Sequence, residues 1–151
     1  MATALTLLAT VLVAVAVADA AYRLIPDGFC VAVLLGGLCT AVVLDRTTLL
    51  DRTVAVMVGY IALRTVAQIY YRLRGRDGLG FGDIKLFAAG GAWVQLTGLP
   101  SVLVWAGVLG LVVTLAGWAR GDRTSGTTEL AFGPYLACGI WLVAAFGPAI
   151  G

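Results

Sequence analysis

Long apolar stretches alternate with short polar breaks along the whole chain. The apolar stretches approach or reach the length of about 17–25 residues that a membrane-spanning helix needs. Backbone polar groups cannot stay unpaired in lipid, so stretches of this kind must form helices. The pattern predicts an all-α integral membrane protein, a bundle of six transmembrane helices. The expected spans cover residues 2–21, 28–44, 53–71, 83–98, 101–119 and 130–149.

Composition supports this class and narrows the range of partners. The chain of 151 residues is 61% hydrophobic and 12% charged, whereas soluble domains carry about 25% charged residues. A net charge of +2 is too small to indicate nucleic-acid binding. No linker or low-complexity segment divides the sequence, so we expect residues 1–151 to form one membrane-embedded domain in contact with the lipid bilayer. The oligomeric state stays open.

Basic residues collect in alternate polar breaks, which orients the predicted bundle. The second break holds Arg46 and Arg52, and the fourth holds no basic residue. Cytoplasmic loops carry the excess of Lys and Arg. We therefore expect a multi-pass protein of the cytoplasmic membrane, with the odd-numbered breaks in the cytoplasm and both termini outside. The odd-numbered breaks hold seven basic residues: Arg23, Arg72, Arg74, Arg76, Lys85, Arg120 and Arg123.

Two acids are candidates for function because they lie at the ends of apolar spans. Asp19 falls near the end of the first span and Asp83 in the first turn of the fourth, so the topology places both near the cytoplasmic face. An ionisable residue at membrane depth is a functional candidate by default. Each acid also has a structural alternative: Asp19 could pair with Arg23 four residues on, and Asp83 could complement its helix macrodipole. We expect Lys85, on another side of that helix, to snorkel to the interface.

Three glycines stand at every second position before Asp83, in the stretch GLGFGDIK that begins at Gly78. A helix start needs one cap rather than three glycines. Since glycine lets a second backbone approach closely, we interpret Gly78, Gly80 and Gly82 as room for an extended peptide. The spacing does not match the GxGxxG of a nucleotide-binding loop.

The absence of histidine limits the available chemistry. It removes His-ligated zinc sites and Ser-His or Cys-His nucleophile pairs, and we expect no metal and no cofactor. A serine–lysine pair would need Lys85, the only lysine. Ser101 is expected at the opposite membrane face, and Ser125 is on the correct side but has no motif around it. Two carboxyl groups at the edge of a low-dielectric region cannot both ionise cheaply and so share a proton. Aspartic proteases use that arrangement. The three cysteines are isolated in apolar stretches: Cys30, Cys39 and Cys138.

At these acids the sequence resembles the prepilin peptidase family, membrane aspartic proteases with a GxGD motif. The matching segments are ADAAYRLIPDG (18–28), GFGDIKLFAAGGAW (80–93) and, more weakly, AFGPYLACG (131–139). The resemblance implies that Asp19 and Asp83 are the catalytic pair. It further implies that Gly80, Gly82 and Lys85 belong to the motif that meets the substrate. The partner that the resemblance implies for this protein is a prepilin or pseudopilin precursor, whose short basic leader would be cut on the cytoplasmic side.

The sequence also departs from the larger members of that family. Those members carry an additional N-terminal region with paired cysteines and N-methylate the new terminus, and neither feature is visible here. We therefore expect a peptidase only, similar to short members that serve Flp-type pili or to archaeal preflagellin peptidases. Two alternatives stay open: a small transporter or channel subunit with Asp19, Asp83 and Arg64 along an ion path, and an inactive scaffold.

Overall fold

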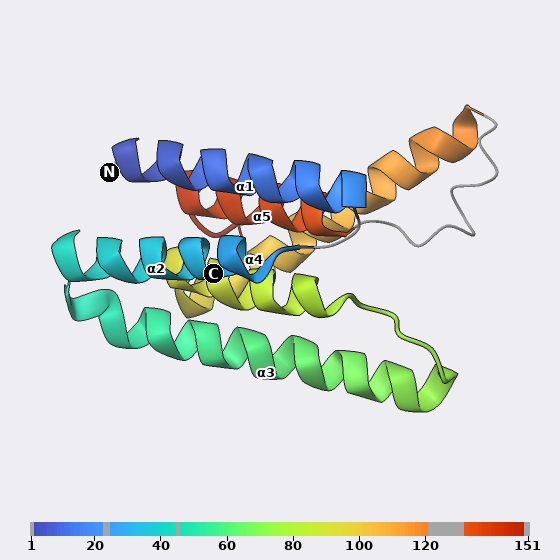
Figure 1. Ribbon diagram of the computed structural model, residues 1–151, viewed down its shortest axis with the longest axis horizontal. Coiled ribbons are helices and arrows are strands. Elements are labelled where there is room, and N and C mark those ends of the chain that lie inside the picture. The colour runs from blue at the N-terminus through green and yellow to red at the C-terminus, as the bar shows by residue number, and fades with distance from the viewer. Residues whose placement is uncertain (1, 23–24, 45, 121–131, 150–151) are drawn as a thin grey trace.

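The computed structural model describes residues 2–22, 25–44, 46–120 and 132–149. Every regular element in these ranges is a helix, which confirms the all-α prediction for the described part of the chain. The helices pack side by side as an elongated bundle (Figure 1). They are α1 (Ala2–Tyr22), α2 (Asp27–Leu44), the short 3-10 helix η1 (Arg46–Thr48), α3 (Leu49–Arg74), α4 (Phe81–Ala119) and α5 (Gly133–Phe146).

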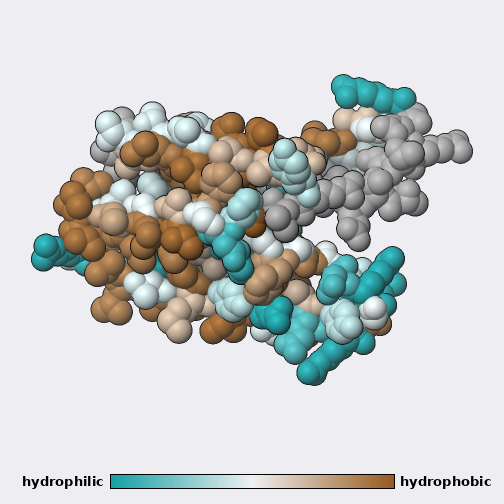
Figure 2. Space-filling model, viewed as in Figure 1, coloured by the Kyte–Doolittle hydropathy of each residue, from teal (hydrophilic) through white to brown (hydrophobic). Residues whose placement is uncertain are grey.

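The surface of the bundle suits a membrane. The four segments that correspond to α1, α2, α3 with η1, and α4 are each long and apolar enough to cross one, and α5 is a shorter apolar helix of 14 residues. Large apolar side chains such as Leu7, Val43 and Leu111 are exposed. Figure 2 shows apolar colour over the body of the molecule and hydrophilic colour at its two ends. The prediction of a multi-pass membrane protein therefore agrees with the structure.

Helix α4 departs from the predicted division into spans. The expected spans 83–98 and 101–119 lie within one element, whose helical geometry breaks at Gln95 (φ 63°, ψ −178°). Beyond the break the chain runs back toward the end at which α4 begins (Figure 1). The sequence placed this break at the TGLPS segment, but Pro100 lies inside the second arm. There the missing N–H removes one helical hydrogen bond, the one to the Leu96 carbonyl oxygen, and the helix continues. The number of six spans stays a prediction.

Two neighbouring residues of α3 satisfy the backbone at the α4 break. In a continuous helix, the Leu96 N–H would donate to the carbonyl oxygen of Ala92. Here the Leu96 N–H donates to Asp51 Oδ2 at 3.3 Å, and the Ala92 oxygen accepts from Arg52 Nη1 at 3.0 Å. Asp51 thus supplies an acceptor for the free N–H, and Arg52 a donor for the free carbonyl oxygen, in place of one helical hydrogen bond. We call these two residues the α3 clasp.

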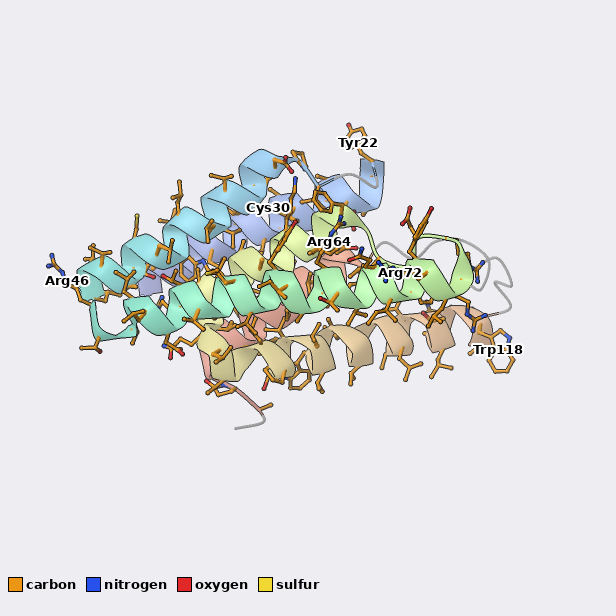
Figure 3. The ribbon with its side chains drawn as sticks, turned by 90° about the horizontal axis from the view of Figure 1, so that it is seen from below. Tyr22, Cys30, Arg46, Arg64, Arg72 and Trp118 are labelled. Carbon is orange, nitrogen blue, oxygen red and sulfur yellow. The ribbon has the colours of Figure 1, made fainter. Side chains whose placement is uncertain are left out.

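The position of Arg52 corrects its assignment to an exposed polar break. Its side chain is 8% exposed, and Nη1 also donates to the Gly37 carbonyl and to Thr40 Oγ1 of α2, both at 3.1 Å. Arg52 therefore joins α2, α3 and α4. Of the two basic residues expected in that break, only Arg46 is exposed, at the opposite end of the bundle from Arg72 (Figure 3).

The first arm of α4 forms the centre of the core. Almost every residue from Asp83 to Val94 is buried, and Ile84, Leu86 and Phe87 are among the largest side chains fully removed from solvent. Helices α2, α3 and α5 all pack against α4, and α1 packs against α5. The N-terminal turn of α4, which carries Asp83, is therefore fixed by neighbours on several sides.

Candidate active site

The structure brings the two predicted catalytic acids to one end of the bundle. Asp19 lies in the last turn of α1 and Asp83 in the first turn of α4. The C-terminal end of α1 and the N-terminal ends of α4 and α5 meet in this region (Figure 1). The two acids are only 7% and 8% exposed, and they are close enough for the charge of Asp19 to act on Asp83. Residues 64 positions apart in the sequence therefore come to the same end of the bundle.

The two carboxyl groups have different surroundings. Asp19 Oδ2 accepts a buried hydrogen bond of 3.0 Å from the backbone N–H of Gly133, at the start of α5. The Asp83 carboxyl group faces the backbone of Gly80, the N-cap residue of α4. Asp83 Oδ1 is buried and has no hydrogen-bond partner among the described residues. Asp83 therefore contacts the start of α4, as the macrodipole interpretation requires. Its Oδ1 atom takes no part in this contact.

The three alternating glycines make room for the protein's own side chains. A Cβ atom at Gly78 would collide with the ring of Tyr70, and one at Gly82 would lie 3.0 Å from Ile25 Cβ. At Gly80 it would lie 3.1 Å from Asp83 Oδ2. Packing within the chain thus accounts for these glycines without a second peptide. The substrate-binding role of Gly80 and Gly82 stays a prediction.

Lys85 has a partner in the structure that the expectation of an interfacial lysine did not include. Its Nζ lies 2.7 Å from Asp27 Oδ1, in the first turn of α2, and 4.6 Å from the centre of the Phe81 ring. The guanidinium of Arg64 lies 5.3 Å from the same ring centre. Lys85 and Arg64 thus gather around Phe81, on a side of α4 different from that of Asp83.

Two contacts join the sequence segments that carry the acids. Ile25 packs over Gly82, and Asp27 pairs with Lys85. The IPD segment after α1 is thereby fixed on the GDIK segment that begins α4. Neither contact was visible from the sequence, because the partners are more than 50 positions apart and only the fold brings them together.

A cavity of about 460 Å³ lies between α2, α3 and α4. Its walls are mostly apolar and include Cys30, Met57 and Tyr60, while Asp27 and Lys85 are among its few polar lining residues. Asp19 and Asp83 do not line it, so the cavity is separate from the two acids.

Some residues named in the sequence analysis lie outside the described ranges, or lie far from the acids. Arg23, the alternative partner of Asp19, and Ser125 are outside the described residues. Ser101 is fully buried near the α4 break and accepts a hydrogen bond of 3.1 Å from the Ala149 N–H. Within the described ranges, no group of three His, Cys, Asp or Glu side chains could hold a metal ion.

Comparison with known proteins identifies the family of the chain. The sequence model of the type IV leader peptidase family matches residues 6–115, which include both acids. The chain belongs to this family. The resemblance seen at the ADAAYRLIPDG and GFGDIK segments is thereby confirmed. No solved structure matches the chain significantly.

Curated relatives in this family are longer proteins. A prepilin leader peptidase/N-methyltransferase of Dickeya chrysanthemi is 39% identical over 84% of this chain and 44% of its own length. The protein of the same name from Pectobacterium carotovorum is 40% identical over 88% of this chain and 47% of its own length. The one from Dichelobacter nodosus is 32% identical over 93% and 47%. The chain therefore spans less than half the length of these relatives.

Proposed function

We propose that this protein is a membrane aspartic endopeptidase that removes the short basic leader of prepilin-like precursors. The observation that carries the proposal is the pair of buried carboxyl groups, Asp19 and Asp83, at one end of the bundle. Membership of the type IV leader peptidase family supports a hydrolase. The printed names of the relatives support prepilins as the class of substrate.

The proposed mechanism uses the two acids as a general base and a general acid. One carboxylate removes a proton from a water molecule, and the resulting hydroxide attacks the carbonyl carbon of the scissile bond. The other carboxyl group gives its proton to the carbonyl oxygen. Collapse of the tetrahedral intermediate breaks the C–N bond, and the amine leaves with a proton returned from the pair. Asp83 Oδ1, which has no hydrogen-bond partner within the described part of the chain, is the oxygen that we assign to the water or the substrate.

We further propose that the acids face the cytoplasm and that both termini lie outside. Exposed basic residues at the end of α3 and just after it share the end of the bundle with the acids, among them Arg72, Arg74 and Arg76. The burial of Arg52 leaves fewer exposed charges at the other end. Both features favour this orientation under the positive-inside rule.

The test is cleavage of a precursor with a basic leader and an apolar helix by purified protein in lipid bilayers. Asp19→Asn and Asp83→Asn should each abolish the shortened product while the protein stays inserted. Asp77→Asn is the matched control, because Asp77 is an exposed acid near the start of α4. A cleaving Asp19→Asn variant would refute the catalytic pair. Ion flux from liposomes without any cleavage by the wild-type protein would favour the transporter or channel alternative.

A further inference from the structure

The start of α5 contacts Asp19 through backbone rather than through a side chain. The Gly133 N–H donates to Asp19 Oδ2 at 3.0 Å, and both groups are buried. The next residue, Pro134, has no N–H and suits the first turn of a helix, and the Leu136 N–H bonds to the Phe132 carbonyl at 3.1 Å. The Asp19 carboxyl group thus meets the positive end of the α5 dipole through Gly133.

Position 133 needs a glycine because there is no room for a side chain beside Asp19, and not because of its backbone conformation. Among the described residues, the glycines with positive φ are Gly75 and Gly147, so Gly133 adopts a backbone that other residues also tolerate. A Cβ atom built there would lie 2.5 Å from Asp19 Oδ2 and 2.8 Å from Asp19 Cγ. Contacts this short force a displacement. Any side chain at this position therefore moves the carboxyl group of Asp19 or the start of α5.

We propose that Gly133 is a positioning residue for the peptidase reaction, because its N–H fixes the Asp19 carboxyl group beside Asp83 and its missing side chain admits that group. The inference rests on the proposed function. The two carboxyl groups then differ in how they are held: Asp19 is fixed by a hydrogen bond from α5, whereas Asp83 Oδ1 has no partner among the described residues. Gly133 acts through Asp19 and not through the substrate, so its replacement should lower kcat and leave KM nearly unchanged.

The experiment compares Gly133→Ala with Gly139→Ala in the cleavage assay. Gly139 lies on the same helix, and a Cβ atom there would lie 2.8 Å from the Val102 carbonyl oxygen, with no contact to Asp19. Both variants should lower the melting temperature. Displacement of a reacting group by about 1 Å costs up to about 100-fold, so we expect Gly133→Ala to lose about 10- to 100-fold in kcat. Gly139→Ala should keep kcat near the wild-type value.

Equal kcat losses in the two variants, or a Gly133→Ala variant with wild-type kcat, would overturn the inference while the cleavage by the wild-type protein still supports the proposed function. A wild-type protein that does not cleave would refute the proposed function itself.

A double-mutant cycle tests the contact between Gly133 and Asp19 without an activity readout, even where Gly133→Ala alone is too unstable to assay. In the Asp19→Ala background, which removes the collision, Gly133→Ala should lower the melting temperature less than in the wild type. An equal loss in both backgrounds would reject the contact.

Discussion

Lys85 Nζ lies 2.7 Å from Asp27 Oδ1 and so joins the start of α4 to the start of α2. This ion pair lies two residues beyond Asp83 along α4 and next to the contact of Ile25 with Gly82. The GDIK and IPD segments are therefore parts of one packed unit at the site, although they are far apart in the sequence.

A charge exchange tests whether Lys85 acts through Asp27. Lys85→Asp alone should lower both the melting temperature and cleavage, because it places two acids together. The double variant Asp27→Lys/Lys85→Asp should recover most of the melting temperature, and cleavage with it. The pair is partly exposed, so its contribution is about 1 kcal/mol or less. Recovery of stability without cleavage would instead indicate that Lys85 itself binds the substrate.

Size compensation tests the role of Gly82. In Gly82→Ala the new methyl group meets Ile25, whose Cβ would lie 3.0 Å away, so the IPD segment must shift and cleavage should fall. Adding Ile25→Val removes Cδ1, which would lie 3.4 Å from the new methyl group, so the shortened side chain gains room to move aside and should restore a small part of the activity. Cleavage rates of the two single variants and the double variant measure this coupling. If Gly82 makes room for substrate, Ile25→Val will give no rescue.

Removal of the Arg52 side chain should be strongly destabilising. Its guanidinium donates to Gly37, Thr40 and Ala92 from a nearly buried position. Because hydrogen bonds from a charged group contribute about 1.5–3 kcal/mol each, Arg52→Met should lower the free energy of unfolding by at least about 2 kcal/mol. Denaturation in detergent or bilayers measures the loss. Arg46→Met is the control, since Arg46 is exposed and makes one described hydrogen bond of 3.3 Å. Equal stability of the two variants would contradict this role of Arg52.

Asp51 should act as a capping residue for the second arm of α4. Its Oδ2 accepts the Leu96 N–H at 3.3 Å, directly after the break at Gln95. Loss of a cap costs about 0.5–2 kcal/mol, so Asp51→Ala should lower the free energy of unfolding by that amount. Asp51→Asn keeps a side-chain oxygen and should lose less. The order is checked by unfolding both variants, and an Asn variant as unstable as the Ala variant would argue against capping.

The sequence predicted the class of fold and the location of the acids because both depend on local signals. Apolar stretches of spanning length define helices in lipid, and the alternation of basic breaks places Asp19 and Asp83 on the same side. In the structure, the C-terminal end of α1 and the N-terminal end of α4, which carry the two acids, lie at the same end of the bundle (Figure 1). The short motifs around them were sufficient to identify the family.

The partners of these residues could not be predicted, because they depend on tertiary contacts. Arg52 stood in a polar break and so had the sequence context of an exposed loop charge, yet it is buried and donates to carbonyl oxygens of two other helices. Pro100 was the local signal for a break, whereas the actual break at Gln95 is stabilised by the α3 clasp. Gly133 was part of a recognised motif, but its contact with Asp19 requires the packing of α5 on α1.

The α3 clasp also has a consequence for biogenesis. The ribosome makes α3 before α4, so Asp51 and Arg52 have already been synthesised when the second arm of α4 emerges. When the chain reverses direction at Gln95, the Ala92 oxygen and the Leu96 N–H can therefore bind Arg52 and Asp51. We therefore expect the direction that the chain takes after Gln95 to depend on the placement of α3, the helix made before it.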